Sequence, residues 1–408
     1  MQIVMRTLVA LLVFPTLAFA AQETGQKTGL DAGILIDDLP GDQAETIWAW
    51  TQDLLDQGKA AGASAQIVRK GKVVYRGVHG ELELASGRLV QSDSLFRIYS
   101  MTKAITSVAF MQLVEQGKLK LDEPISKYLP EWEKVTVLQK NEDNTWGEVA
   151  TTTPITARHL LRHTSGLTSV GLRSREAARQ GPLHSLEDLS KRLADLPLKH
   201  QPGEAWTYGH STNVLGRLIE VVAEQPFDTY VQEQILDPLG MVDTSFRVTE
   251  EDLPRLASVH KTDDNDKVVG VASGYLKSYQ AERPIPLGGS GLISTLEDYG
   301  RFQAMLLAGG LYGEKRILKE ETVALMLDPH KGKAQILMAH FGLGFMLHGS
   351  REEPLLMRYA SWSGIARTYF VNDHVTETGS LLFTQTVPFN FNPGFSFQNM
   401  LRRVLENE

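Results

Sequence analysis

The chain has 408 residues, of which 42% are hydrophobic and 22% are charged, as is typical of a globular enzyme. Its formal net charge is −8 and no basic cluster stands out, so a nucleic-acid partner is not expected. The sequence contains no cysteine, which excludes disulfides, thiolate metal ligands and a cysteine nucleophile. This length suits two lobes around one site better than a single small core.

The first twenty residues differ in kind from the rest. Arg6 is their only charge, and the apolar run from Leu8 to Ala20 ends in Ala18-Phe19-Ala20. This pattern is typical of a cleavable export signal, and the run is shorter than the roughly 20 residues that a membrane-spanning helix needs. We expect residues 1–20 to be a signal peptide cut after Ala20, residues 21–40 to be a flexible leader, and the mature protein to be periplasmic or secreted. A retained membrane anchor is the alternative.

The next elements are predicted from hydrophobic patterning. A short helix is predicted over 47–55, followed by a hairpin whose strands, 63–68 and 73–76, flank the turn Arg69-Lys70-Gly71-Lys72. The helix predicted over 102–115 is apolar on nearly every side and ends at Gly117. Such a helix is usually buried at the centre of a domain.

The middle of the chain is predicted to be mainly helical, and strands return near its end. Predicted helices cover 157–163, 186–196 and 212–223, and a capping box of Ser294 and Glu297 begins another that ends at Leu307. Predicted strands cover 341–347, 366–371 and 380–387, before a helix over 395–405.

Strands at both ends with helices between them indicate one sheet assembled from both termini. We therefore predict an α+β fold, an α/β sandwich whose mainly antiparallel sheet is flanked by helices. The sheet-containing domain is expected to comprise 41–120 and 290–408, and the inserted all-helical domain of this fold is expected in the mostly helical segment 121–289. A site between two such lobes is a usual place for a ligand.

The strongest local signal for chemistry is Ser100-Met101-Thr102-Lys103. A serine hydroxyl is a weak nucleophile until a base takes its proton, and at a helix N-terminus positions i and i+3 share one face. The helix end also offers free backbone N–H groups where oxyanion charge develops. For Lys103 to act as the base it must be largely neutral, which burial favours. The alternative is an N-capped core helix with a surface lysine.

The spacing alone is a weak signal, because Ser258-Val259-His260-Lys261 has the same form. This second copy precedes an acidic loop and no buried helix follows it. We interpret it as a chance match.

Several ordered stretches carry a family resemblance. The segment from Phe96 to Lys103 resembles the nucleophile segment of serine β-lactamase-related hydrolases, a group that includes class C β-lactamases, family VIII carboxylesterases and penicillin-binding-protein-like enzymes. Further matching stretches are Leu160–Leu167, Pro202–Tyr208, Val214–Glu220, Pro238–Met241 and Gly289–Ser294. The resemblance runs from about Gly62 to Val387. It implies the β-lactamase/transpeptidase-like fold and an acyl-enzyme mechanism without a metal or another cofactor.

In that family, the tyrosine of a Y-x-N motif shares the base role with the lysine. Tyr208-Gly209-His210 stands in this place, so the resemblance implies Tyr208 as the third catalytic residue. His210 replaces the asparagine that helps to hold the lysine and the substrate amide. We take His210 as a substrate-binding candidate and leave the consequence of the replacement open.

The family's K-T-G element lies on a strand beside the site. Lys27-Thr28-Gly29 precedes the nucleophile and is therefore in the wrong order, so Trp362-Ser363-Gly364 is the expected counterpart. Such W-x-G variants resemble the esterases, and an indole in place of a cation favours an uncharged, apolar group. By the same analogy, the oxyanion hole consists of the backbone N–H groups of Ser100 and Ile365.

Two other enzyme classes fit less well. Gly209-His210-Ser211-Thr212-Asn213 is close to the G-x-S-x-G motif of α/β-hydrolases, but its last glycine is missing and no strand precedes it. His159 and His163 have the i, i+4 spacing of a zinc metalloprotease but lack the glutamate between them.

We predict an exported Ser-Lys-Tyr serine hydrolase, a carboxylesterase with at most weak β-lactam hydrolysis. Its partner is a small-molecule ester or amide substrate, and no integral membrane segment is expected after signal removal. A β-lactamase or a D-alanyl-D-alanine carboxypeptidase on the same scaffold stays open, as does a non-catalytic binding module. The physiological substrate, the acyl chain length and the oligomeric state are not predicted.

Overall fold

The computed structural model describes residues 34–36, 39–168, 181–272, 284–329, 335–336, 339–349, 357–388 and 393–405. The expected signal peptide, most of the expected leader and Lys27-Thr28-Gly29 lie outside these residues. Within the described ranges, no helix is both long and apolar enough to cross a membrane.

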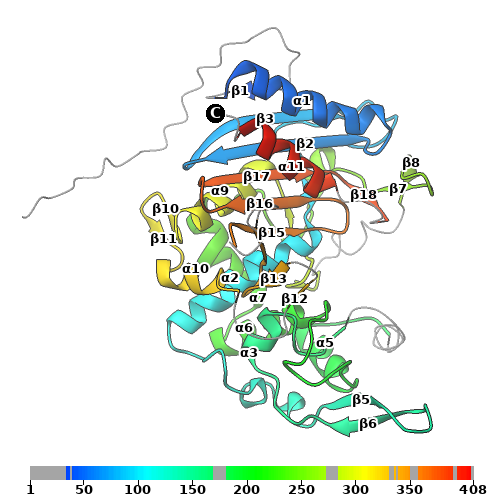
Figure 1. Ribbon diagram of the computed structural model, residues 1–408, viewed down its shortest axis with the longest axis vertical. Coiled ribbons are helices and arrows are strands. Elements are labelled where there is room, and N and C mark those ends of the chain that lie inside the picture. Colours follow the sequence, from blue (N-terminus) through cyan, green and yellow to red (C-terminus); the bar gives the residue numbers. More distant parts are fainter. Residues whose placement is uncertain are drawn as a thin grey trace, which may run out of the picture.

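A nine-stranded antiparallel sheet forms the centre of the larger lobe (Figure 1). Its strand order is β1-β3-β2-β17-β16-β15-β14-β13-β12. The strands are β1 Ile34–Ile36, β2 Gly62–Arg69, β3 Lys72–Gly80, β12 Gln335–Ile336, β13 Ala339–Phe341, β14 Met346–His348, β15 Tyr359–Ser363, β16 Tyr369–Asp373 and β17 Thr378–Phe383. Strand β2 pairs with β17, so the N-terminal and C-terminal strands meet inside the sheet. The prediction of one antiparallel sheet built from both termini is confirmed.

Helices cover both faces of the sheet (Figure 1). Successive side chains of β17 point to opposite faces of the sheet. On one face, Leu382 packs with α1 (Gly41–Asp56) and α11 (Pro393–Leu405). Leu381 and Phe383 belong instead to the main core, with α2 (Thr102–Glu115) and α9 (Leu296–Leu307). Each such buried side chain contributes about 1.5–3 kcal/mol, so both helical layers are held to the sheet by apolar contact.

The other lobe lies below the sheet in Figure 1 and is rich in short helices. They are α3 Ala157–Leu161, α5 Leu186–Ala194, α6 Ser211–Ala223, α7 Phe227–Val231, the π-helical turn Gln232–Leu236 and α8 Asp237–Leu239.

Single 3₁₀ turns cover Tyr99–Met101, Ile125–Lys127, Pro130–Trp132 and Leu253–Arg255. Helix α10 is Glu320–Met326.

Short strand pairs complete the fold. They are β4 Phe96–Arg97 with β9 Ile293–Ser294, β5 Thr136–Lys140 with β6 Trp146–Ala150, β10 Leu311–Tyr312 with β11 Lys315–Arg316, and β7 His260–Thr262 with both β8 Val268–Val271 and β18 Thr386–Val387. The segment 121–289 therefore contains two hairpins that the prediction of an all-helical domain did not include. In the first, Asn144 takes a φ of 65° at the turn, a conformation that asparagine tolerates.

Helix α2 has the bounds that its sequence predicts, whereas some other elements differ. The predicted strand 341–347 is a hairpin of β13 and β14, because Gly344 adopts a φ of 99° between them. The predicted strand 366–371 begins only at Tyr369, since residues 364–367 form a turn in which Arg367 N–H donates to the Gly364 carbonyl at 3.0 Å. The N-cap of α9 is Thr295, whose hydroxyl accepts from Asp298 N–H, and not Ser294.

Candidate active site

Ser100 lies in the 3₁₀ turn that leads directly into α2. The residue before it, Tyr99, has a φ of 43°, which for a non-glycine residue costs on the order of 1–3 kcal/mol. The segment is held from the side by β9, which pairs with β4, and by Ile98 N–H, which donates to the Leu292 carbonyl at 3.1 Å. The backbone around Ser100 is therefore fixed by a buried helix and by a second strand.

Lys103 lies one turn further along α2 and is only 5% exposed. Its Nζ is 3.3 Å from Ser100 Oγ and donates a hydrogen bond of 2.6 Å to the Gly289 carbonyl. Nζ also lies 4.7 Å from the centre of the Tyr208 ring. Helix α2 is buried from Thr102 to Leu113, which places the Lys103 amine inside the protein beside the serine.

Tyr208 precedes α6 and its hydroxyl donates to Ser100 Oγ at 2.7 Å. The ring is packed among other rings: its centroid lies 4.9 Å from that of His163, 6.1 Å from Trp206 and 5.3 Å from Trp362. Thr207 N–H donates to the His163 carbonyl at 2.8 Å, which holds the segment before Tyr208 in place. Serine, lysine and tyrosine thus meet within hydrogen-bond reach.

His210 lies beside this group and bonds to Asn213. Asn213 Nδ2 is 3.1 Å from His210 Nδ1, and Asn213 Oδ1 accepts from Gly289 N–H at 2.8 Å. Burial lowers the pKa of His210 to about 4. His210 is therefore neutral at pH 7.

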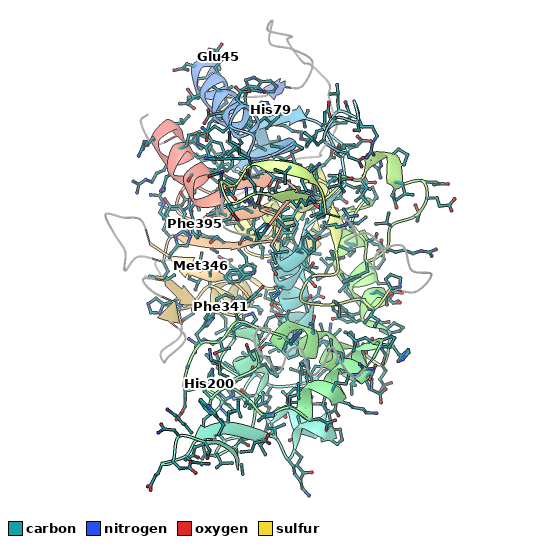
Figure 2. The ribbon with its side chains drawn as sticks, turned by 90° about the vertical axis from the view of Figure 1, so that its right-hand side faces the viewer. Glu45, His79, His200, Phe341, Met346 and Phe395 are labelled. Atoms are coloured by element: carbon teal, nitrogen blue, oxygen red, sulfur yellow. The ribbon has the colours of Figure 1, made fainter. Side chains whose placement is uncertain are left out.

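Strand β15 ends against the nucleophile segment. A Cβ on Gly364 would lie 2.5 Å from the Ile98 carbonyl oxygen, so only glycine permits this approach. Trp362, two residues earlier, is half-buried, and its ring centroid lies 5.2 Å from that of Phe341. In Figure 2, Phe341 is labelled between Met346 of the sheet and His200 of the helical lobe. The indole is part of an aromatic wall next to Tyr208.

Ser363 ends β15 and Ile365 follows in the turn. Ile365 is 49% exposed, and no residue that the structure describes accepts a hydrogen bond from its backbone N–H. The turn is tied to the nucleophile segment because Thr368 Oγ1 donates to the Ile98 carbonyl at 3.3 Å. The oxyanion role expected for this N–H stays a prediction.

The residues of the competing motifs lie in other surroundings. Ser258 Oγ donates to Glu83 at 2.6 Å, and Lys261 lies on β7. Ser211 is fully buried with its Oγ 2.9 Å from that of Ser165. His159 Nδ1 accepts from the backbone N–H of Thr156 in the cap of α3.

His163 is also buried and lies against Tyr208 and Phe341, after the end of α3. In the described part of the chain, no group of three or more histidine and acidic side chains is arranged to hold a metal ion.

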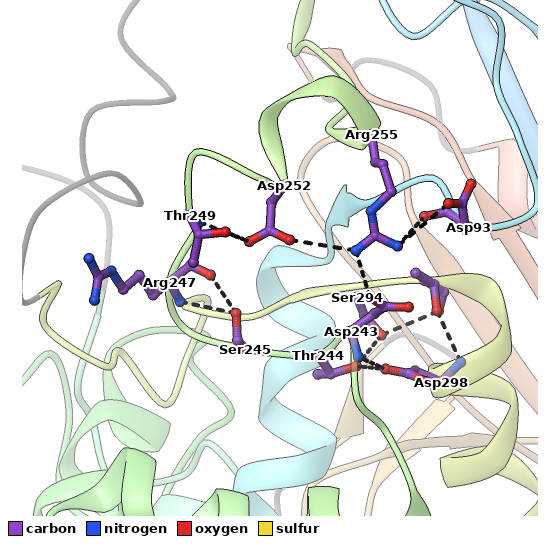
Figure 3. Close-up of polar contacts among 11 residues, drawn as sticks. Asp93, Asp243, Thr244, Ser245, Arg247, Thr249, Asp252, Arg255, Ser294 and Asp298 are labelled. Carbon is purple, nitrogen blue, oxygen red and sulfur yellow. Dashed lines mark hydrogen bonds and ion pairs between the residues drawn. The ribbon is translucent and has the colours of Figure 1, made fainter.

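A polar network supports β9 from outside the site (Figure 3). Asp298, at the start of α9, accepts from Thr244 Oγ1 at 2.9 Å and from the Asp243 N–H at 2.8 Å. Asp243 in turn forms a 2.5 Å ion pair with Arg255. Burial raises the pKa of Asp298 to about 6.

The fold and these residues define a class of protein: a serine hydrolase with the β-lactamase/transpeptidase-like fold. The sequence matches the family model described as "Beta-lactamase" over residues 48–402, and the chain belongs to this family.

Similar proteins include an esterase and a synthase. The protein Rv1367c of Mycobacterium tuberculosis is 33% identical over 374 residues, which cover 86% of this chain and 90% of the relative. Lovastatin esterase of Penicillium rubens is 32% identical over 291 residues, which cover 69% of this chain and 72% of the relative. The solved structure of simvastatin synthase from Aspergillus terreus has a TM-score of 0.76 at 22% identity and covers 90% of this chain and 98% of its own, which shows a shared fold.

Sequence reasoning missed two participants in this geometry. In the sequence, Asn213 stands in place of the last glycine of a G-x-S-x-G motif and ends Ser211-Thr212-Asn213, which imitates an S-x-N motif although Tyr208 fits the family position better. Gly289 is there only the first residue of a matching stretch. Nothing in the local sequence links either of them to Lys103, because the links run through a backbone carbonyl between distant segments. An asparagine one turn after the tyrosine motif was the only available signal.

Proposed function

We propose that this protein is an exported carboxylesterase that acts through an acyl-enzyme on Ser100, with at most weak β-lactam hydrolysis. The observation that carries the proposal is the position of Ser100 Oγ, 2.7 Å from the Tyr208 hydroxyl and 3.3 Å from Lys103 Nζ. A serine so placed has beside it two groups that can take its proton when they are deprotonated, and nucleophilic catalysis by serine requires such a base.

The proposed reaction has two halves. Ser100 Oγ attacks the ester carbonyl carbon while its proton passes to the Tyr208–Lys103 pair, and the backbone N–H groups of Ser100 and Ile365 hold the resulting oxyanion. The intermediate collapses, the C–O bond to the alcohol breaks, and the alcohol leaves with the proton from the pair. Water then attacks the acyl-enzyme, gives its proton to the same pair and releases the acid, and Ser100 recovers its proton.

The preference for esters is supported by the wall beside Ser100. Trp362, the expected counterpart of the lysine in the family's K-T-G element, packs its ring against those of Tyr208 and Phe341. An apolar wall favours an uncharged acyl or alcohol group, since a carboxylate placed there would lose its hydration without gaining a partner. The lovastatin esterase among the relatives is consistent with this preference.

A substrate comparison tests the proposal. The second-order rate constant kcat/KM is measured for a neutral nitrophenyl ester, a chromogenic cephalosporin and a D-alanyl-D-alanine peptide, with Ser100→Ala as the blank. We expect the ester to exceed the other two by at least about 100-fold, which corresponds to about 2.7 kcal/mol. A higher value for the β-lactam or the peptide would replace the esterase assignment, and no turnover of any of them would favour a binding module.

The proposed export has its own measurement. The signal-like pattern of residues 1–20 ends in Ala18-Phe19-Ala20, which supports cleavage after Ala20. Expression of the full chain in a Gram-negative host, followed by fractionation and intact mass analysis, should give a periplasmic protein that begins at Ala21. A cytoplasmic protein that retains Arg6 would contradict this part of the proposal.

A further inference from the structure

The orientation of one side-chain amide fixes the proton of a histidine in the site. Gly289 N–H can only donate, so the atom of Asn213 that lies 2.8 Å from it must be the carbonyl oxygen Oδ1. The other end of the amide, Nδ2, therefore faces His210 Nδ1 at 3.1 Å. Because an NH₂ group only donates, Nδ1 must accept, and it carries no proton.

The second ring nitrogen of His210 must then hold the proton. Burial keeps the imidazole neutral near pH 7, with a pKa of about 4. A neutral imidazole carries one proton, and with Nδ1 excluded that proton is on Nε2. Among the residues that the structure describes, none accepts a hydrogen bond from this Nε2–H. The donor is therefore available to another molecule.

The same amide acts on Lys103 through a single residue, Gly289. While the Gly289 N–H is held by Asn213, its carbonyl accepts from Lys103 Nζ at 2.6 Å. The preceding carbonyl, of Gly288, accepts from Thr106 Oγ1 of α2 at 2.8 Å. A Cβ on Gly289 would lie 2.8 Å from Asn213 Oδ1 and 3.4 Å from Nζ, so glycine is what lets the amide approach this closely.

We infer that Asn213 is a positioning residue with two effects: it holds the Gly289 carbonyl on Lys103, and it fixes His210 as the Nε2–H tautomer that donates to an oxygen atom of the substrate. The second effect rests on the proposed function, because it names a contact of the same site. At the position where the family's Y-x-N motif has an asparagine amide, His210 then offers a neutral imidazole N–H as the donor. The substrates that gain from it carry a hydrogen-bond acceptor, such as a carbonyl or ether oxygen, in addition to the scissile ester.

Nitrogen NMR of histidine-labelled protein tests the tautomer without any catalytic readout. The His210 signals are those that disappear in His210→Gln. In the wild-type protein at pH 7, we expect the proton on Nε2; a proton on Nδ1, or a doubly protonated ring, would overturn the inference. This measurement on the wild type needs no variant beyond the one used for assignment.

Asn213→Asp keeps the size and the acceptor oxygen of the side chain but removes its NH₂ donor. A carboxylate still accepts from Gly289 N–H but cannot donate to His210 Nδ1, so the proton should move to Nδ1. Asn265→Asp adds the same charge in the exposed β7–β8 turn and should leave the His210 tautomer unchanged. An Nε2–H tautomer that persists in Asn213→Asp would show that Asn213 does not set it.

Kinetics test the two effects on the substrate and on Lys103. His210→Leu should lower the ratio of kcat/KM between an ester with an extra acyl-chain oxygen and its hydrocarbon analogue by about tenfold, and His210→Gln should restore the ratio because it keeps an N–H donor. Asn213→Ala should slow acylation of Ser100 by about tenfold. An unchanged ratio or an unchanged acylation rate would overturn the corresponding effect. If wild-type Ser100 is never acylated, the proposed function fails while the tautomer assignment stands.

Discussion

The Tyr208 hydroxyl lies 2.7 Å from Ser100 Oγ although 108 positions separate the two residues in the chain. Ser100 is carried by the turn before α2, and Tyr208 by the segment before α6. Val108 of α2 and Val214 of α6 belong to one continuous apolar core. The distance between the two hydroxyls therefore depends on how the two helices pack.

Replacement of Ser100 by alanine should abolish ester turnover without unfolding the protein. The side chain removed is small, and no other aliphatic hydroxyl lies within the Ser-Lys-Tyr group. We expect kcat to fall by at least about 10³-fold. Ser258→Ala, in the second S-x-x-K sequence, is the matched control and should retain activity. Comparable losses in both variants would show that the assay reports stability and not the nucleophile.

Tyr208→Phe removes only the hydroxyl and keeps the ring against His163 and Trp362. If the hydroxyl relays the serine proton, kcat should fall by about 10²–10⁴-fold, the usual range for loss of a general base or acid. The melting temperature should change little. Near-normal kcat in a folded Tyr208→Phe protein would restrict the proton transfer to Lys103.

Trp362→Lys should shift preference towards substrates with a carboxylate. The ammonium would stand in the aromatic wall beside Tyr208, where it could pair with a substrate anion. The measurement is the ratio of kcat/KM for a carboxylated ester and its neutral analogue, with Trp362→Phe as the control that keeps an apolar ring. An unaltered ratio would mean that Trp362 does not line the substrate site.

Asp298→Asn should change how stability depends on pH. Burial raises the pKa of Asp298 from 3.8 to about 6, so between these values the folded state holds a proton that the unfolded state has released. Stability from this group is therefore present below pH 3.8 and is lost as the pH rises to 6. The variant lacks this pH-dependent contribution of Asp298. The difference in free energy of unfolding, variant minus wild type, should therefore rise by about 2–3 kcal/mol between pH 4 and pH 7. Parallel profiles in urea unfolding would contradict the assignment.

Much of the central architecture could be predicted from local sequence. Helix α2 is apolar on all sides, so its bounds and its burial follow from hydrophobicity alone. The hairpin of β2 and β3 follows from its Lys70-Gly71 turn. The reach of Lys103 to Ser100 is a consequence of helical spacing, which is the same in every helix.

Other features depend on contacts that no local pattern contains. Strand β15 was not predicted because small and polar residues interrupt its two aromatic residues, Tyr359 and Trp362, and no apolar run marks it. It is held in the sheet by pairing with β14 and β16. Gly344 divides a continuous apolar run into two strands by adopting a positive φ. The approach of Tyr208 to Ser100 came from the family resemblance, and the bridge of Asn213 and Gly289 to Lys103 required the three-dimensional structure.

The most direct test of the account is the intact mass of the protein after brief exposure to an activated ester, followed by peptide mapping. We expect one added acyl group per chain, located on Ser100, that is lost again on standing and never forms in Ser100→Ala. An unmodified protein, or an acyl group on any other residue, would contradict the assignment of Ser100 as the nucleophile.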